Sequence, residues 1–339
     1  PQSITLRSHC PKLQGRSRQQ SAAFSGGEDA PPQRHLLPRI GHRQIGDLEP
    51  GEVLELCQNV QAAGTVETGR RVCKIVSAVL SRAVVEGLAQ RDFSMDVLKQ
   101  LAMPQRRNFA AILDPKALGA LLRAIDNYGG TFVVSCALRL APLVMLRPGE
   151  LRQAKWSEID LDNGLWLIPS KRMKRTLAEK ENGEDHLVPL PRQAVAILES
   201  LFPLTGRADF VFPSGRGGGR SMSANTLNVA LKTMGYDTQE DMTAHGFRAT
   251  ARTMLVERLK WSSQYAEMQL AHSVPDANGT AYNRAEFEED RQKMLQEWAD
   301  YLDELRSGNV TSGQSLRDRF KPVTHRWASH FAGQAGAAV

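Results

Sequence analysis

The apolar residues of this chain repeat every three to four positions along most of its length, and this helical period changes in only one region. Between Trp156 and Ile168, two short extended runs flank Asp162-Asn163-Gly164, a sequence typical of a hairpin turn. A third extended run spans His186 to Leu190, and helical spacing returns from Arg192. The pattern predicts a mainly α-helical protein that carries one small antiparallel β-sheet.

Two helical domains are expected. In the first, residues 35–103, helical spacing is clearest in two runs: Val53, Leu54, Leu56, Cys57 and Val60, then Val72, Ile75, Val76, Val79, Leu80, Ala83 and Val84. Residues 104–113 read as a basic linker. Asp114-Pro115 then has the form of an N-cap followed by a first-turn proline, which predicts the start of a second domain that runs to residue 308.

Both ends of the chain lack a sustained apolar period. Residues 1–34 are rich in Ser, Gln, Arg, Gly and Pro, so we expect a disordered or degenerate N-terminal arm. Residues 309–339 are rich in Gly, Ser, Thr and Ala and are expected to form a disordered tail.

Composition favours an intracellular protein with a polyanionic partner. The 43 Lys and Arg residues outnumber the 37 Asp and Glu residues, which mildly favours nucleic acid. The four cysteines are scattered without zinc-ligand spacing, so we expect reduced thiols and no metal site. The longest apolar stretch, 132–146, is interrupted by Arg139 and is shorter than the roughly 20 residues of a membrane span. With no signal peptide apparent, the chain is expected in the cytoplasm, associated with the nucleoid.

Four polar segments in the second domain form a candidate site. Each has an ordinary interpretation alone: Pro148 and Glu150 are typical of a helix start, and His245 and Arg248 would be neighbours on any helix. Their order and spacing are more informative. The segments are Arg147-Pro-Gly-Glu150, Lys171-Arg-Met-Lys174-Arg, His245-Gly-Phe-Arg248, and Leu270-Ala-His272 followed by Ala281-Tyr282.

This set resembles the catalytic signature of the tyrosine recombinases, and most of all the integrases of temperate phages and genomic islands. The likeness extends from about His35 to Leu305. It implies a helical core-DNA-binding domain followed by a mixed α+β catalytic domain, and a reaction that needs no cofactor or metal. The residues it assigns to catalysis are Arg147, Glu150, Lys174, His245, Arg248, His272 and Tyr282.

The implied chemistry is phosphoryl transfer. Arg147 and Arg248 supply planar cations for the non-bridging oxygens of the phosphate. Tyr282 is the expected nucleophile and His245 assists its proton transfer, while Lys174, expected on the strand after Ile168, protonates the leaving 5′ oxygen. In addition, His272 is expected to donate a hydrogen bond to the phosphate, and Glu150 to support Arg147 or His245.

Two features depart from the family pattern. Residues 175–185 make the connection between Lys174 and His186 longer than expected for a hairpin, and Lys171 is the competing candidate for the general acid. Residues 1–34 do not resemble the arm-binding domain with which such integrases usually begin.

The expected partners are double-stranded DNA attachment sites, other copies of the chain in a homotetramer on DNA, and accessory DNA-bending or directionality proteins. The cations expected to bind DNA are Arg70, Arg71, Lys74, Arg82, Arg106 and Arg107. Two other functions remain open: DNA relaxation like that of a type IB topoisomerase, and an inactive DNA-binding remnant.

The segment from Arg284 to Leu305 is predicted to form an amphipathic helix. Its apolar stripe consists of Phe287, Met294, Leu295, Trp298, Leu302 and Leu305. Because such a stripe is not stable in water, the helix must dock, either in the core of its own domain or, as the resemblance implies, on a neighbouring protomer.

Overall fold

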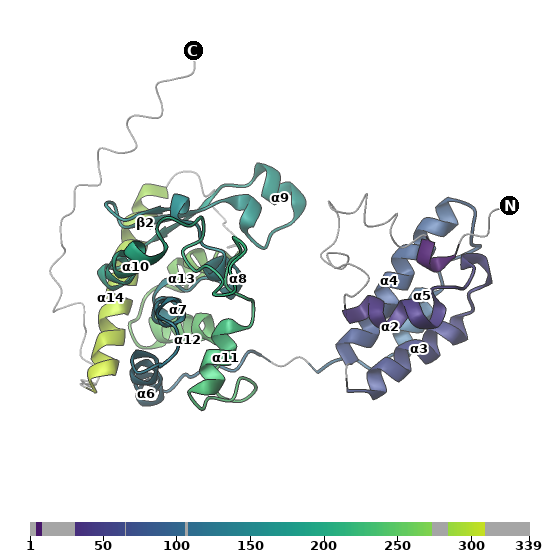
Figure 1. The fold of residues 1–339 in the computed structure, drawn as a ribbon, viewed down its shortest axis with the longest axis horizontal. Coiled ribbons are helices and arrows are strands. Elements are labelled where there is room, and N and C mark those ends of the chain that lie inside the picture. The colour runs from purple at the N-terminus through teal and green to yellow at the C-terminus, as the bar shows by residue number, and fades with distance from the viewer. Residues whose placement is uncertain (1–4, 9–30, 65, 106–107, 273–283, 309–339) are drawn as a thin grey trace, which may run out of the picture. The chain divides into compact units, whose positions relative to one another are not determined.

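The computed structural model describes residues 5–8, 31–64, 66–105, 108–272 and 284–308, and within these it leaves out the side chains of 31–33, 177 and 284–287. The chain divides into two compact units, Pro1–Arg107 and Asn108–Val339, whose helices and strands are labelled in Figure 1. The division falls inside the segment that the sequence predicts as a basic linker. The mainly helical architecture with one small antiparallel sheet is confirmed.

The described part of the first unit is mainly helical, with one isolated β-bridge between Thr5 and Gln44. Its helices are α2 (Pro31–Ile40), α3 (Pro50–Ala62), α4 (Val66–Val85) and α5 (Ser94–Gln100). The apolar residues of the two predicted runs form its core, where Val53, Val76 and Leu80 are fully buried. Pro50 stands in the first turn of α3, and the side chain of Glu52 accepts a hydrogen bond from the backbone of Glu49, so this helix starts with a reciprocal cap.

Part of the predicted N-terminal arm is ordered. The side chain of Leu6 is fully buried in the first unit, and its backbone N–H donates to the carbonyl of Arg43 at 3.0 Å. Helix α2 also begins within the arm, at Pro31. The expectation of disorder is therefore wrong for these residues, because a single buried leucine and a backbone bridge give no periodic signal in the sequence.

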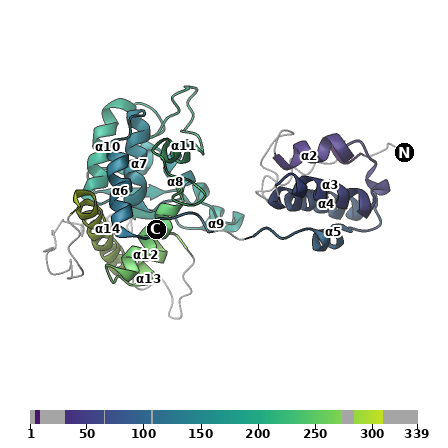
Figure 2. The same ribbon diagram turned by 90° about the horizontal axis from the view of Figure 1, so that it is seen from below.

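The second unit is built around the apolar helix α7 (Phe132–Val144). The helices that pack on α7 include α6 (Pro115–Asp126), α10 (Arg192–Thr205) and α14 (Arg284–Ser307). Figure 2 shows α6, α7 and α10 running side by side. The predicted cap is present, since the Asp114 side chain accepts from the backbone N–H of Ala117 at 2.8 Å.

The sheet of the second unit has three antiparallel strands in the order β1-β2-β3. They are β1 (Ile159–Asp160), β2 (Leu165–Ile168) and β3 (His186–Pro189), and the turn between the first two contains Gly164 at a φ of 62°. Trp166 pairs with Ile159 on one side and Val188 on the other. Trp166 and Ile168 are buried while Leu167 is half exposed, which is the alternation expected of a sheet with one face on the core.

The long connection between β2 and β3 contains a 3-10 turn, η3 (Ser170–Arg172), and a short helix, α9 (Leu177–Asn182). Thr176 caps α9, because its hydroxyl accepts from the backbone of Glu179 while the Glu179 carboxylate accepts from the backbone of Thr176. In Figures 1 and 2, α9 extends away from the rest of its unit.

The end of the predicted linker is an integral part of the second unit. The carbonyl of Ala110 accepts from the backbone N–H of Thr243 at 3.0 Å, and the carbonyl of Ile112 accepts from the Thr250 hydroxyl at 2.8 Å. A Cβ on Gly246 would lie 2.1 Å from the Ala110 carbonyl oxygen, so only glycine allows this close approach. Residues 108–113 are thus tied to the start of helix α12 (Gly246–Glu257).

Helix α14 packs in the core of its own unit. Trp298 is buried and donates from Nε1 to the carbonyl of Pro142 at 2.8 Å, and Met294, Leu295, Leu302 and Leu305 are buried with it. Arg123 on α6 donates to the carbonyl of Leu305 at 3.2 Å. Docking of this stripe on a neighbouring protomer is therefore wrong for the described side chains, because α6 and α7 already cover them; the side chain of Phe287 lies outside the description.

Cys57, Cys73 and Cys136 are buried free thiols, and Cys10 lies outside the described residues. None of the helices in the described ranges combines the length and apolar character needed to cross a bilayer.

Candidate active site

Arg147 is held at the start of helix α8 (Pro148–Arg152) by the acid three residues later. One Glu150 carboxylate oxygen accepts from the Arg147 backbone N–H and the other accepts from its guanidinium Nη1, both at 3.0 Å. The carboxylate is buried, whereas one fifth of the Arg147 side chain remains exposed. Glu150 therefore holds both the backbone and the guanidinium of Arg147, while part of the arginine side chain stays accessible.

Arg248 lies in the first turn of α12 and is almost fully buried. Its guanidinium donates to the carbonyl of Met145 at 2.7 Å and to the carbonyl of Leu270 at 2.8 Å. Burial, and next the charge of Arg147, lower the pKa of Arg248 to about 10. Arg248 therefore stays charged at neutral pH, with the ends of α7 and α13 (Ser263–Gln269) bound to it.

His272 completes this cluster. Its Nε2 lies 3.1 Å from a guanidinium nitrogen of Arg248, which can only donate, so Nε2 is the acceptor and Nδ1 carries the hydrogen. Nδ1 faces the Glu267 carboxylate, which also accepts from Arg252. The sequence predicts that His272 donates to a phosphate, whereas in this arrangement it accepts from Arg248; donation would require Nε2 to release that partner.

His245 stands at the N-cap of α12, next to the same arginines. Burial is the main cause that lowers its pKa to about 4, followed by the charges of Arg248, Arg147 and Lys174. The imidazole is thus neutral at pH 7. The ring of Phe109, from the segment tied to α12, lies 4.2 Å from the His245 ring between centroids.

The candidate general acid lies in the loop after η3. Lys174 and Lys171 are both exposed, and neither is on a strand, which corrects the expected location of Lys174 on the strand after Ile168. The strand β2 ends at Ile168 because Pro169 and the turn η3 follow it. Of these two lysines, Lys174 is the one whose charge acts on the pKa of His245.

The structure thus brings together five of the seven predicted site residues, by direct contact or because their charges act on the pKa of His245 or of Arg248: Arg147, Glu150, His245, Arg248 and Lys174. His272 joins them through Arg248. Tyr282 lies outside the described residues, as do Arg106 and Arg107.

Sequence analysis misses three side chains around the site. Glu267 orients His272, Phe109 lies against His245, and Arg172 contacts the helix that carries Glu150. The basic run containing Arg172 is visible in the sequence, but its motif draws attention to the lysines alone. Nothing in the sequence around Phe109 or Glu267 marks either residue.

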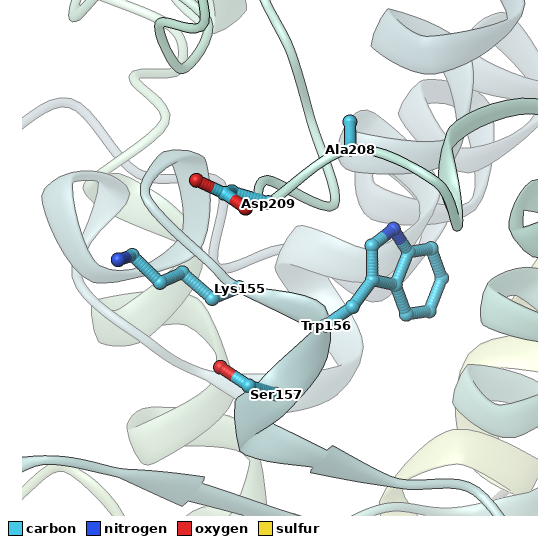
Figure 3. Close-up of a pocket in the computed structure, with 5 residues that line it drawn as sticks. All are labelled: Lys155, Trp156, Ser157, Ala208 and Asp209. Carbon is cyan, nitrogen blue, oxygen red and sulfur yellow. The ribbon is translucent and has the colours of Figure 1, made fainter.

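A pocket in the second unit is separate from this cluster. Lys155, Trp156, Ser157, Ala208 and Asp209 line an open pocket of about 240 Å³ (Figure 3), and none of them belongs to the predicted site. Among the described side chains, no three His, Cys, Asp or Glu residues are grouped as a metal site.

Comparison with known proteins defines the class of this fold and site. Residues 31–100 match the phage integrase central domain, and residues 111–289 match the phage integrase family. The chain belongs to the phage integrase family, which consists of tyrosine-type integrases.

Among its curated relatives are bacterial prophage and phage proteins. The chain is 35% identical over 275 residues to the putative protein IntB of Escherichia coli strain K12, a match that covers 79% of this chain and 69% of IntB. It is 33% identical over 283 residues to the integrase of Enterobacteria phage P4, covering 82% of this chain and 64% of the phage protein. The chain therefore spans about two thirds of the length of these relatives.

Solved structures share the fold at lower identity. The chain matches a lambda integrase dimer bound to a COC′ core site with a TM-score of 0.58 and 16% identity, covering 85% of this chain and 78% of that chain. A lambda integrase tetramer bound to a Holliday junction matches with a TM-score of 0.58 and 15% identity, covering 83% of this chain and 81% of that chain.

Proposed function

We propose that this chain is a site-specific recombinase that cuts and rejoins DNA through a 3′-phosphotyrosyl intermediate. The observation that carries the proposal is the convergence of Arg147, Arg248 and His245, with Lys174 close enough to affect the pKa of the histidine. Three cations around a neutral imidazole suit a phosphodiester whose negative charge increases in the transition state.

In the proposed cleavage step, Tyr282 Oη attacks phosphorus and the bond between phosphorus and the 5′ oxygen breaks. The phenol, whose ordinary pKa is about 10, must lose its proton as it attacks. His245 accepts that proton, because its lowered pKa keeps it neutral. Lys174 donates a proton to the leaving 5′ oxygen. The products are a 3′-phosphotyrosine and a free 5′ hydroxyl, and attack by a 5′ hydroxyl on the phosphotyrosine reverses the step.

Binding and orientation of the phosphate are proposed for the two arginines. Arg147, anchored by Glu150 but partly exposed, offers its remaining guanidinium donors to one non-bridging oxygen. Arg248 is oriented by the backbone carbonyls of Met145 and Leu270, to which it donates, and by His272.

DNA binding by the first unit is proposed for the exposed cations on α4, whereas Arg70, also expected to bind DNA, is engaged within the unit. Arg71 and Lys74 are exposed, Arg82 pairs with Glu86 at 2.6 Å, and Arg70 donates to the carbonyls of Leu98 and Leu101. The proposed partners are double-stranded attachment sites and, as in the lambda integrase tetramer, further copies of the chain on DNA, with accessory DNA-bending or directionality proteins. The proposed location is the cytoplasm, at the nucleoid.

The test is a covalent adduct. The protein is incubated with a nicked duplex that carries the attachment-like sequence flanking its gene, and SDS-stable protein–DNA complexes are resolved on a denaturing gel. Tyr282→Phe removes only the attacking oxygen, so it should abolish the adduct and leave DNA affinity nearly unchanged. Tyr128→Phe, in the same unit but outside the proposed site, is the matched control and should form the adduct normally. An adduct formed by Tyr282→Phe would show that another residue is the nucleophile.

A further inference from the structure

We propose that Arg172 is the positioning residue that places Lys174 at the scissile phosphate. The inference rests on the proposed function, in which Lys174 is the general acid. Arg172 does not touch the substrate in this scheme. It acts by tying the loop that carries Lys174 to the helix that carries Arg147 and Glu150.

The contacts of Arg172 are those of a clamp. Its Nη1 donates to the backbone carbonyl of Glu150 at 2.6 Å, and its Nη2 donates to the carboxylate of Glu158 at 2.6 Å. The ion pair is largely buried, with the Arg172 side chain 13% exposed and that of Glu158 5% exposed. Glu158 is itself fixed, because it accepts from Nε1 of the fully buried Trp166 at 3.1 Å. Both acceptors of Arg172 are therefore held by other parts of the unit, Glu150 within α8 and Glu158 by Trp166.

The carbonyl that Arg172 binds belongs to a helix end. The last carbonyls of any α-helix lack an intrahelical partner, and α8 has only five residues. Arg172 satisfies the Glu150 carbonyl from outside the helix. The same residue, Glu150, uses its side chain to hold Arg147. One residue of α8 thus links the proposed phosphate-binding arginine to the lysine loop.

Met173, the residue between Arg172 and Lys174, couples the position of Lys174 to these bonds. Met173 has an extended conformation (φ −77°, ψ 157°) and its side chain is buried in the core. Arg172 and Lys174 flank this buried residue, so the bonds of Arg172 fix the backbone on one side of Met173 and Lys174 follows directly on its other side. The Lys174 charge accordingly acts on His245.

A second set of bonds ties the same loop to the α9 connection, and it includes Arg175, which follows Lys174 and donates to the Ser170 hydroxyl at 3.1 Å and to the carbonyl of Glu184 at 2.6 Å. The Ser170 backbone N–H donates to Asp185 at 2.8 Å, and the Ser170 hydroxyl donates to the carbonyl of Glu179 at 2.6 Å. These bonds fix the loop to the α9 connection, which extends away from the unit (Figure 1). Among the described contacts of the loop, those of Arg172 are the ones that join it to α8.

The experiment compares two substrates in single-turnover cleavage: an ordinary duplex, and one in which sulfur replaces the bridging 5′ oxygen of the scissile phosphate. A thiolate leaves without a proton, so the sulfur substrate does not need the general acid. The main variant is Arg172→Lys, which keeps a cation for Glu158 but lacks the planar fork that reaches two acceptors. A lysine misplaced by about 1 Å should lower cleavage of the ordinary duplex by up to about 10²-fold. The sulfur substrate should be cleaved within about threefold of the wild-type rate.

Three further variants make the result decisive. Lys174→Ala should show the same rescue by sulfur, and Arg192→Lys, an exposed arginine paired with Asp300, should behave as wild type on both substrates. The paired variant Arg172→Gln with Glu158→Gln removes both buried charges together. It is used in place of Arg172→Lys if the Arg172→Lys protein does not fold.

The outcomes separate the two proposals. Equal slowing of both substrates would mean that Arg172 only stabilises the fold, and unchanged rates in both Arg172 variants would mean that it does not position the acid; either result overturns this inference. Failure of sulfur to rescue Lys174→Ala would instead overturn the assignment of Lys174 in the proposed function. Rescue of Lys174→Ala and of the Arg172 variants supports both.

Discussion

Two histidines in the second unit are kept neutral by their surroundings, and they illustrate how the same residue type serves different purposes. His245 is half-buried beside Arg248 and Arg147, in the proposed site. His186 on β3 is buried, and its Nε2 lies 3.2 Å from the carbonyl of Gln269, an arrangement that needs the hydrogen on Nε2. Burial, and next the charge of Arg291, lower the pKa of His186 to about 3.

The pKa of His186 predicts acid sensitivity of the second unit. Between pH 6.5 and about 3 the unfolded chain binds a proton at this residue and the folded chain does not, so the free energy of unfolding falls as the pH falls through this window. The expected contribution is a loss of about 2 kcal/mol between pH 8 and pH 5. His186→Gln cannot titrate and keeps a donor for the Gln269 carbonyl, so its loss on acidification should be smaller by that amount.

Urea unfolding followed by tryptophan fluorescence at the two pH values measures this difference. All five tryptophans of the chain lie after residue 108, so the fluorescence comes from the second unit. Trp156, Trp166, Trp261 and Trp298 belong to its described part, and Trp327 lies outside the described residues. Other titrating groups are common to both proteins and cancel. Equal acid losses in the wild type and in His186→Gln would contradict the predicted neutral state of the buried ring.

At the scale of elements, we expect the second unit to need α14 in order to fold. Trp298 is 1% exposed and donates to the Pro142 carbonyl, so its indole is packed against α7. Trp298→Ala is expected to lower the free energy of unfolding by about 3–5 kcal/mol. Lys293→Ala, at an exposed position on the same helix, should change it by less than about 0.5 kcal/mol.

Thermal unfolding monitored by circular dichroism checks this prediction. Deletion of residues 287–339 should likewise unfold the second unit and leave the first unit folded, because the two have separate cores. A truncated chain that keeps both transitions would show that α14 contributes little to the core, and would restore docking on a neighbouring protomer as the role of its apolar stripe.

At the scale of the whole molecule, DNA affinity should depend on salt through the exposed cations of the first unit. Arg71 and Lys74 are exposed on α4, and the pair of Arg71 with Glu67 at 3.3 Å is itself exposed and weak. Each phosphate neutralised contributes about −0.9 to the slope of log affinity against log salt. The slope of the double variant Arg71→Ala and Lys74→Ala should therefore be less negative than that of the wild type by about 1.8.

Arg70→Ala is the matched control in this measurement. Because its guanidinium donates to the carbonyls of Leu98 and Leu101, at the end of α5, this variant should lower the melting temperature of the first unit and leave the slope unchanged. Fluorescence anisotropy of a labelled duplex over a range of salt concentrations measures both slopes. A weaker salt dependence in Arg70→Ala, with that of the double variant unchanged, would reverse the assignment of these cations.

Much of the architecture follows from local signals in the sequence. The period of apolar residues predicts the helices of both units, and Asp162-Asn163-Gly164 predicts the hairpin, because amphipathic spacing and turn geometry are properties of neighbouring residues. The motifs around Arg147, His245 and Arg248 mark these residues as a candidate site for the same reason, since each motif spans only a few positions.

Contacts between distant segments are decided by the tertiary structure. The sequence by itself determines that residues 284–305 form an amphipathic helix, but not that its stripe packs on α6 and α7, because periodicity identifies an apolar face and not its partner. It determines that four of the five residues 171–175 are basic, yet only the fold shows Arg172 bound to Glu150 and Glu158 while the charge of Lys174 acts on the pKa of His245. These pairings depend on which carbonyls and carboxylates are left without local partners when the helices pack, and that is a property of the folded molecule.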